Sequence, residues 1–165
     1  MNGNNGSMGN SSRKGMQESG LGMKWHKFLI YFLLWVGALL NITNGILYFT
    51  GKMYGDEASS VYRMFPDLAG ADKIMGVLCF ACVVLQLVTR FALAGYKANG
   101  PKLLMGTYAL GAASSVFYCI LADAAIPQLT FSGVFQDVLG TVVSSVFMIV
   151  VNHVYYNKRE ALFVN

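Results

Sequence analysis

The stretch FLIYFLLWVGALLNITNGILYF, residues 28–49, carries no charged side chain and decides the fold. As a helix rising about 1.5 Å per residue, it spans the roughly 30 Å of hydrocarbon in a lipid bilayer. Because a backbone inside lipid must satisfy its own hydrogen bonds, the stretch is predicted to be a transmembrane helix. Three further long apolar runs follow at about 74–94, 103–122 and 132–155. The sequence therefore predicts an all-α fold, a polytopic membrane protein built as a bundle of four transmembrane helices.

The composition of the 165-residue chain points the same way. Hydrophobic residues make up 55% of it and charged residues only 12%, whereas soluble domains contain about 25% charged residues. Few residues remain outside the four runs, so a separate soluble catalytic or nucleic-acid-binding domain is excluded and no nucleic-acid partner is expected. We expect three parts: a disordered cytoplasmic tail over 1–22, which is rich in Gly, Asn and Ser, the transmembrane domain over 23–157, and a cytoplasmic tail over 158–165.

The distribution of Lys and Arg predicts the orientation. Nine lie on one side of the predicted membrane: four in the N-terminal segment, three around the second connection and two in the C-terminal tail. The other side has three, which are Lys52, Arg63 and Lys73. Under the positive-inside rule both termini are cytoplasmic. The sequence thus predicts a multi-pass protein of the cell membrane with an even number of spans.

Each of the four runs carries small and polar residues at spacings of three and four, which places them on one helical face. Such faces hold membrane helices together by close backbone approach and interhelical hydrogen bonds, so we expect them to turn inward. Counted from the outer ends at about 1.5 Å per residue, several polar side chains reach a similar depth in the outer leaflet. The candidates for a shared binding pocket are Asn41, Asn44, Tyr118, Asp137 and Thr141.

Two interpretations of these polar residues stay open. They are either packing residues, each worth only about 0.6–2 kcal/mol, or a binding pocket. Asp137 poses the same choice, because a carboxylate inside the membrane boundary marks a functional site whereas one at the start of the fourth helix caps it. His26 and His153 are predicted to be interfacial anchors, and no metal site is expected because no carboxylate or cysteine lies at their depth.

Cys79-Phe80-Ala81-Cys82 forms a Cys-x-x-Cys motif near the outer end of the second run. The arrangement resembles the quinone-reducing, disulfide-generating membrane oxidases and the vitamin K epoxide reductases, which are four-helix bundles with such a motif near an outer helix end. The resemblance implies a redox disulfide between Cys79 and Cys82 beside a bound quinone. The chain departs from these families in two ways: its external connections contain no second cysteine pair, and no cationic side chain lies near the thiols to stabilise a thiolate.

The segment WHKFLIYF, residues 25–32, opens the first span, and a basic tail follows the fourth. In these features the chain resembles small four-span membrane proteins of Gram-positive bacteria. The resemblance implies a helix bundle located in the cell membrane but no particular activity.

The leading interpretation is a non-enzymatic accessory or interaction subunit in contact with the lipid bilayer and with a membrane-protein partner or further copies of itself. The first alternative is a small-solute or ion transporter or channel subunit that uses the outer polar pocket. The second is a quinone-linked thiol oxidoreductase acting through Cys79 and Cys82, and only this one requires a cofactor.

Overall fold

The computed structural model of the protein describes residues 22–126 and 131–163, excepting the side chains of residues 131–137. The structure is all-α, as the sequence predicts. Four of its helical segments are long and apolar enough to cross a membrane. This confirms the part of the prediction that concerns the number and the character of the long helices. The predicted N-terminal tail lies outside the described residues except for Gly22.

The first long helix is continuous through three segments. It starts with α2 (Lys24–Phe28), passes through η1 (Leu29–Leu33), a single π-helical turn, and continues as α3 (Leu34–Thr50). It ends at Gly51, whose φ of 72° lies in the left-handed region that favours glycine.

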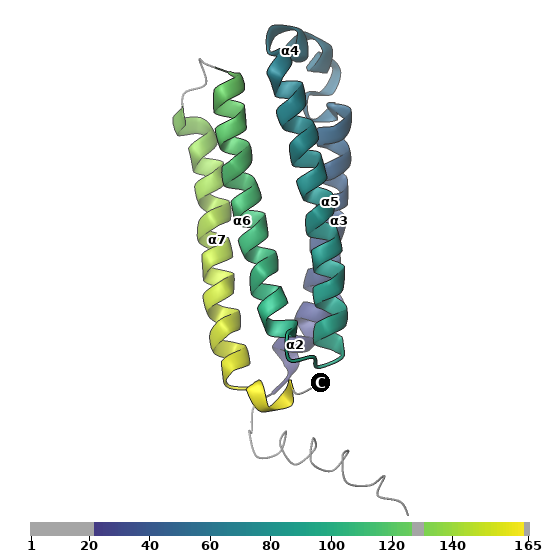
Figure 1. The fold of residues 1–165 in the computed structure, drawn as a ribbon, viewed down its shortest axis with the longest axis vertical. Coiled ribbons are helices and arrows are strands. Elements are labelled where there is room, and N and C mark those ends of the chain that lie inside the picture. Colours follow the sequence, from purple (N-terminus) through teal and green to yellow (C-terminus); the bar gives the residue numbers. More distant parts are fainter. Residues whose placement is uncertain (1–21, 127–130, 164–165) are drawn as a thin grey trace, which may run out of the picture.

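Gly51 also has a packing reason to be glycine. A Cβ at this position would come within 2.7 Å of the Tyr62 ring. The chain can therefore fold tightly back into η2 (Lys52–Glu57) and α4 (Ala58–Met64), which lie at the ends of α3 and the next long helix (Figure 1).

The second long helix, α5 (Pro66–Ala94), begins eight residues before the span predicted at 74–94. Phe65 has a non-helical backbone (φ −131°, ψ 77°) that separates α5 from α4, and Pro66 supplies the fixed φ suited to a first helical position. Hydropathy starts the span later because Asp72 and Lys73 are charged. Asp72 consequently lies inside a helix and not in a loop.

The third and fourth long helices are α6 (Gly100–Ala125) and α7 (Phe131–Asn157), and a short turn, η3 (Glu160–Leu162), follows. Both helices extend beyond the predicted spans by one to three residues at each end. Gly100 and Pro101 open α6, where glycine lets the chain approach the α5 backbone closely: a Cβ would meet the Ala92 carbonyl oxygen at 3.3 Å.

The long helices pack in chain order, α3 on α5, α5 on α6 and α6 on α7. Figure 1 shows two antiparallel pairs, α3 with α5 and α6 with α7, that lie close together near the chain termini and diverge toward α4. We call these two ends of the bundle the termini end and the α4 end.

The hydrophobic core gathers at the termini end, where both described ends of the chain meet. It is formed by Leu29, Ile30, Leu34, Leu93, Leu104, Tyr156 and Phe163. Polar contacts also cross it: Trp25 Nε1 donates to Asn152 Oδ1 at 3.1 Å, and His26 Nδ1 lies 2.9 Å from the Tyr156 hydroxyl. His26 is only 1% exposed. It is therefore a core residue and not the interfacial anchor that the sequence predicts, because aromatic rings from three other segments enclose it.

Candidate functional site

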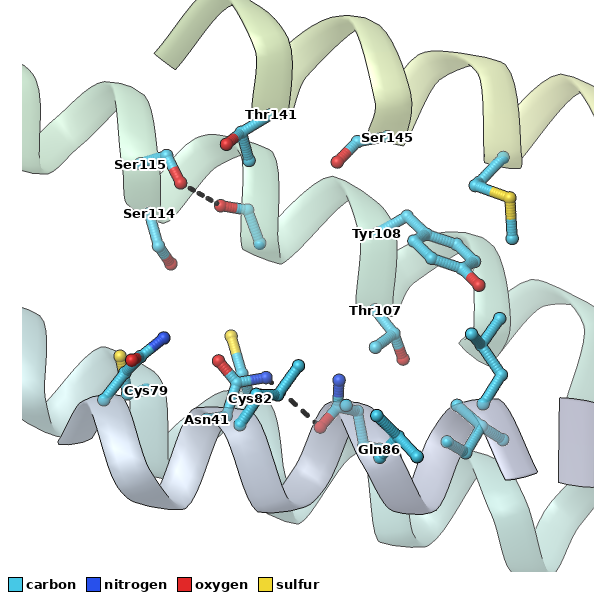
Figure 2. Close-up of a pocket in the computed structure, with 18 of the residues that line it drawn as sticks. Asn41, Cys79, Cys82, Gln86, Thr107, Tyr108, Ser114, Ser115, Thr141 and Ser145 are labelled. Carbon is cyan, nitrogen blue, oxygen red and sulfur yellow. Dashed lines mark hydrogen bonds between the residues drawn. The ribbon is translucent and has the colours of Figure 1, made fainter. Parts of the chain in front are cut away.

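A cavity of about 610 Å³ lies between the two helix pairs, and all four long helices line it (Figure 2). Helices α3 and α5 form one wall, and α6 and α7 form the opposite wall. Small-molecule sites in proteins have volumes of roughly 300–1,000 Å³, so the cavity has the size of a ligand site.

Most of the residues that the sequence singles out line this cavity: Asn41, Asn44, Cys79, Cys82 and Thr141. Tyr118 instead lies at the α4 end, where its ring contacts the ring of the lining residue Tyr48 at 5.1 Å between centroids. Asp137 belongs to α7, but its side chain lies outside the described residues. The helical spacing thus brings together the predicted polar groups of α3, α5 and α7, and the two interpretations of Asp137 both stay predictions.

The polar groups of the lining are uncharged. Among the described residues that line the cavity, none is acidic, basic or a histidine. A charged ligand would lose its hydration there without meeting a counter-charge, which is unfavourable. The lining is therefore suited to a neutral ligand. Its amide and aliphatic hydroxyl groups belong to Asn41, Asn44, Gln86, Thr107, Ser114, Ser115, Thr141 and Ser145.

Two hydrogen bonds organise the middle of the cavity. Asn41 Nδ2 donates to Gln86 Oε1 at 3.2 Å, which joins α3 to α5 within one wall. The Thr89 and Thr107 hydroxyls lie 3.0 Å apart and join α5 to α6. The helical spacing predicts inward-facing polar residues such as Asn41, but it does not show which of them pair.

Ser114 on α6 lines the cavity with a side chain that is only 4% exposed. Its Oγ makes no hydrogen bond to a nitrogen or oxygen atom within the described part of the chain, and it interacts with the Cys82 thiol. Because a thiol is only a weak hydrogen-bond partner, this hydroxyl can also bond to a ligand in the cavity.

The two thiols of the Cys-x-x-Cys motif also face this cavity. Cys79 and Cys82 are free, and they are 3% and 5% exposed. The third cysteine, Cys119, is free and buried on α6. Any thiol chemistry at the motif would therefore take place inside the cavity.

Asp72 is the site residue that sequence reasoning missed. It is 1% exposed, and its Oδ1 accepts hydrogen bonds from Tyr118 at 2.7 Å and from Tyr54 at 3.4 Å. Its Oδ2 accepts a hydrogen bond from Tyr62 at 2.8 Å. These four residues, which we call the Asp72 cluster, connect α5 to α6, η2 and α4 at the α4 end of the cavity. The signal that could have revealed it is Pro66, which places Asp72 two turns inside a helix.

Within residues 22–126 and 138–163, no group of three or more His, Cys, Asp or Glu side chains is placed to hold a metal ion. The features available for chemistry in and beside the cavity are thus neutral hydrogen-bonding groups, the thiols of Cys79 and Cys82, and the buried Asp72 carboxylate. The chain matches no protein-family model, no curated protein and no solved structure.

Proposed function

We propose that the protein is a non-enzymatic integral protein of the cell membrane that binds a small uncharged molecule between its four helices. The observation that carries ligand binding is the cavity itself: its lining combines amides and hydroxyls from all four helices with apolar side chains and no charge among the described residues. A subunit that only had to pack would gain contacts by closing this space, because protein interiors are normally close-packed.

Membrane insertion is supported by the outward faces of the helices. Large apolar side chains on α3, α5 and α7 are 55–65% exposed, which soluble monomers rarely allow over a continuous surface. In a bilayer these side chains contact lipid. Examples are Leu39, Val84, Phe91, Phe147 and Val150.

The proposed orientation places the termini end in the cytoplasm. It is supported by the excess of Lys and Arg on that side of the predicted spans. Green fluorescent protein fused after Asn165 should fluoresce, and alkaline phosphatase inserted at Gly55 should be active. The reverse pattern would overturn the orientation.

Ligand binding is tested by filling the cavity. A Cβ at Gly111, which lines the cavity, would meet no atom within 4 Å, so Gly111→Leu can fill the space without a clash. Gly106→Leu is the matched control, because Gly106 lies on the same helix in equally open surroundings away from the cavity.

Native mass spectrometry of the protein released from mild detergent gives the readout. We expect a small-molecule adduct on the wild type and on Gly106→Leu, and its loss on Gly111→Leu. An adduct that survives Gly111→Leu would place the ligand elsewhere, and the absence of any adduct from the wild type would count against ligand binding.

A further inference from the structure

We infer that the cavity recognises an uncharged carboxamide group carried on an alkyl chain, an inference that rests on the ligand-binding function proposed above. The ligand class is indicated by three polar side chains in the middle of the cavity, Asn41, Gln86 and Ser114, and by the apolar residues beyond them.

The Asn41–Gln86 pair leaves one acceptor and one donor group for a ligand. Its single hydrogen bond uses Asn41 Nδ2 and Gln86 Oε1. The flanking atoms, Asn41 Oδ1 and Gln86 Nε2, make no hydrogen bond to any other described residue. Figure 2 shows both amides directed into the space between the walls. The free acceptor and the free donor lie on opposite sides of the bond that joins the two amides, and each complements one of the two polar groups of a carboxamide, its N–H and its C=O.

Gly37 holds the Gln86 amide in this place. A Cβ at Gly37 would lie 2.8 Å from Gln86 Nε2, so the amide occupies the room that glycine leaves on α3. Any larger residue at this position would displace the donor from the pair. The glycine therefore has a role in positioning a polar group as well as in helix packing.

The opposite wall supplies a further hydrogen-bonding group. Ser114 on α6 is buried, and among the described residues the Cys82 thiol, a weak hydrogen-bonding group, is the only partner of its Oγ. A ligand carbonyl between the walls can accept from this hydroxyl while the ligand N–H is donated to Asn41. The Ser114 hydroxyl and the free atoms of the amide pair can thus bond to the same ligand group.

The apolar part of the lining indicates that the ligand carries an alkyl chain. Leu33 and Leu34 line the cavity seven to eight residues before Asn41, which is roughly 11 Å along the helix toward the termini end. Met148 lines the same region from α7. An amphiphile with its amide at Asn41 can therefore place its chain against these apolar side chains.

The test compares decanamide, decan-1-ol and n-decane as probes in proteoliposomes. Occupancy is read from the rate at which N-ethylmaleimide labels the lining residue Cys82 in Cys79→Ser/Cys119→Ser protein. We expect decanamide to slow labelling about tenfold more than the other two probes do. One to two additional net hydrogen bonds between its amide group and the cavity would produce a difference of this size. Equal protection by decane or decan-1-ol would overturn the inference.

Variants connect that result to the named residues. Gln86→Leu should abolish the selectivity for decanamide, and Gly37→Ala should weaken it by displacing the same amide, which keeps the test valid if Gln86→Leu does not fold. Thr43→Val is the control, because Thr43 bonds within its own helix to the Leu39 carbonyl. Unchanged selectivity in both Gln86→Leu and Gly37→Ala would also overturn the inference.

Failure here can be distinguished from failure of the proposed function. If an adduct is lost in Gly111→Leu but decanamide protects no better than decane, the cavity binds a ligand of another class. If no adduct exists and no probe protects Cys82, ligand binding itself fails.

Discussion

At the residue scale, Asp72 shows how this molecule stabilises a charge-bearing group in its interior. A buried carboxylate is unfavourable unless its oxygens are hydrogen-bonded. The three phenol groups of the Asp72 cluster supply those bonds from positions 10, 18 and 46 residues away. The carboxylate is thus satisfied by neutral donors, and each donor fixes a different segment.

Asp72→Asn should destabilise the protein by about 1–3 kcal/mol, because the amide replaces one acceptor oxygen with a donor that faces phenol hydroxyls. The measurement is the midpoint of thermal unfolding in detergent. Asp67→Asn is the control, since Asp67 is exposed in the first turn of the same helix. Midpoints that fall equally in the two variants would contradict the importance of the cluster.

Gly51→Ala should also destabilise the protein, because it combines a left-handed backbone cost of about 1–2 kcal/mol with a clash against Tyr62. Gly70→Ala should do the opposite and stabilise it by about 0.5–1 kcal/mol, because Gly70 lies in open space inside helix α5. Thermal unfolding in detergent distinguishes the two. Equal effects of the two substitutions would show that the turn tolerates a side chain.

At the element scale, the bundle consists of two helix pairs with specific connections between them. The Thr89–Thr107 contact joins α5 to α6, and near the α4 end Tyr118 joins the same helices through Asp72. Tyr118 also places its ring against Tyr48 of α3. Tyr118 therefore connects α6 to both helices of the other pair near the α4 end.

Tyr118→Phe should loosen α6 from α5 at the α4 end, because it keeps the ring but removes the donor to Asp72. We expect N-ethylmaleimide to label the buried Cys79 about tenfold faster, which corresponds to the loss of one hydrogen bond to a charged group. Tyr62→Phe is the control, because it removes a donor to the same carboxylate without releasing α6. Identical labelling rates in wild type and Tyr118→Phe would show that the helices stay together without this bond.

At the scale of the whole molecule, the two ends of the described chain are fastened to one another. Arg159 donates to the Gly22 carbonyl at 3.1 Å and to the Tyr155 carbonyl at 2.9 Å. Its guanidinium carbon lies 3.7 Å from the centroid of the Tyr155 ring. This contact and the aromatic core around His26 hold the first and last helices together at the termini end.

Arg159→Ala should release the start of the first helix. Tryptic cleavage after Lys24 should become about tenfold faster, because losing one to two hydrogen bonds lowers the free energy of local unfolding at this site. Mass spectrometry of the N-terminal fragment follows the cut. Lys158→Ala removes the neighbouring, exposed charge and should leave the rate unchanged; a similar acceleration in both variants would refute the role given to Arg159.

Much of the cavity could be predicted from the helical spacing of polar residues. Asn41, Cys82 and Thr141 line it because a period of 3.6 keeps residues three and four apart on one face, and that face turns toward the neighbouring helices. The spacing could not show that the helix pairs diverge and leave a space of about 610 Å³. That space depends on which helices contact each other, and such contacts join residues distant in sequence.

The sequence by itself determined four long apolar helices, because a backbone surrounded by apolar side chains satisfies its hydrogen bonds locally. Only the tertiary structure decided that Asp72 and His26 are buried. Hydropathy treats a charged or polar residue beside an apolar run as the boundary of a span, whereas burial depends on the partners that other segments bring. For Asp72 these partners are tyrosines from three other elements, and for His26 they are rings from the far end of the chain and from Tyr96.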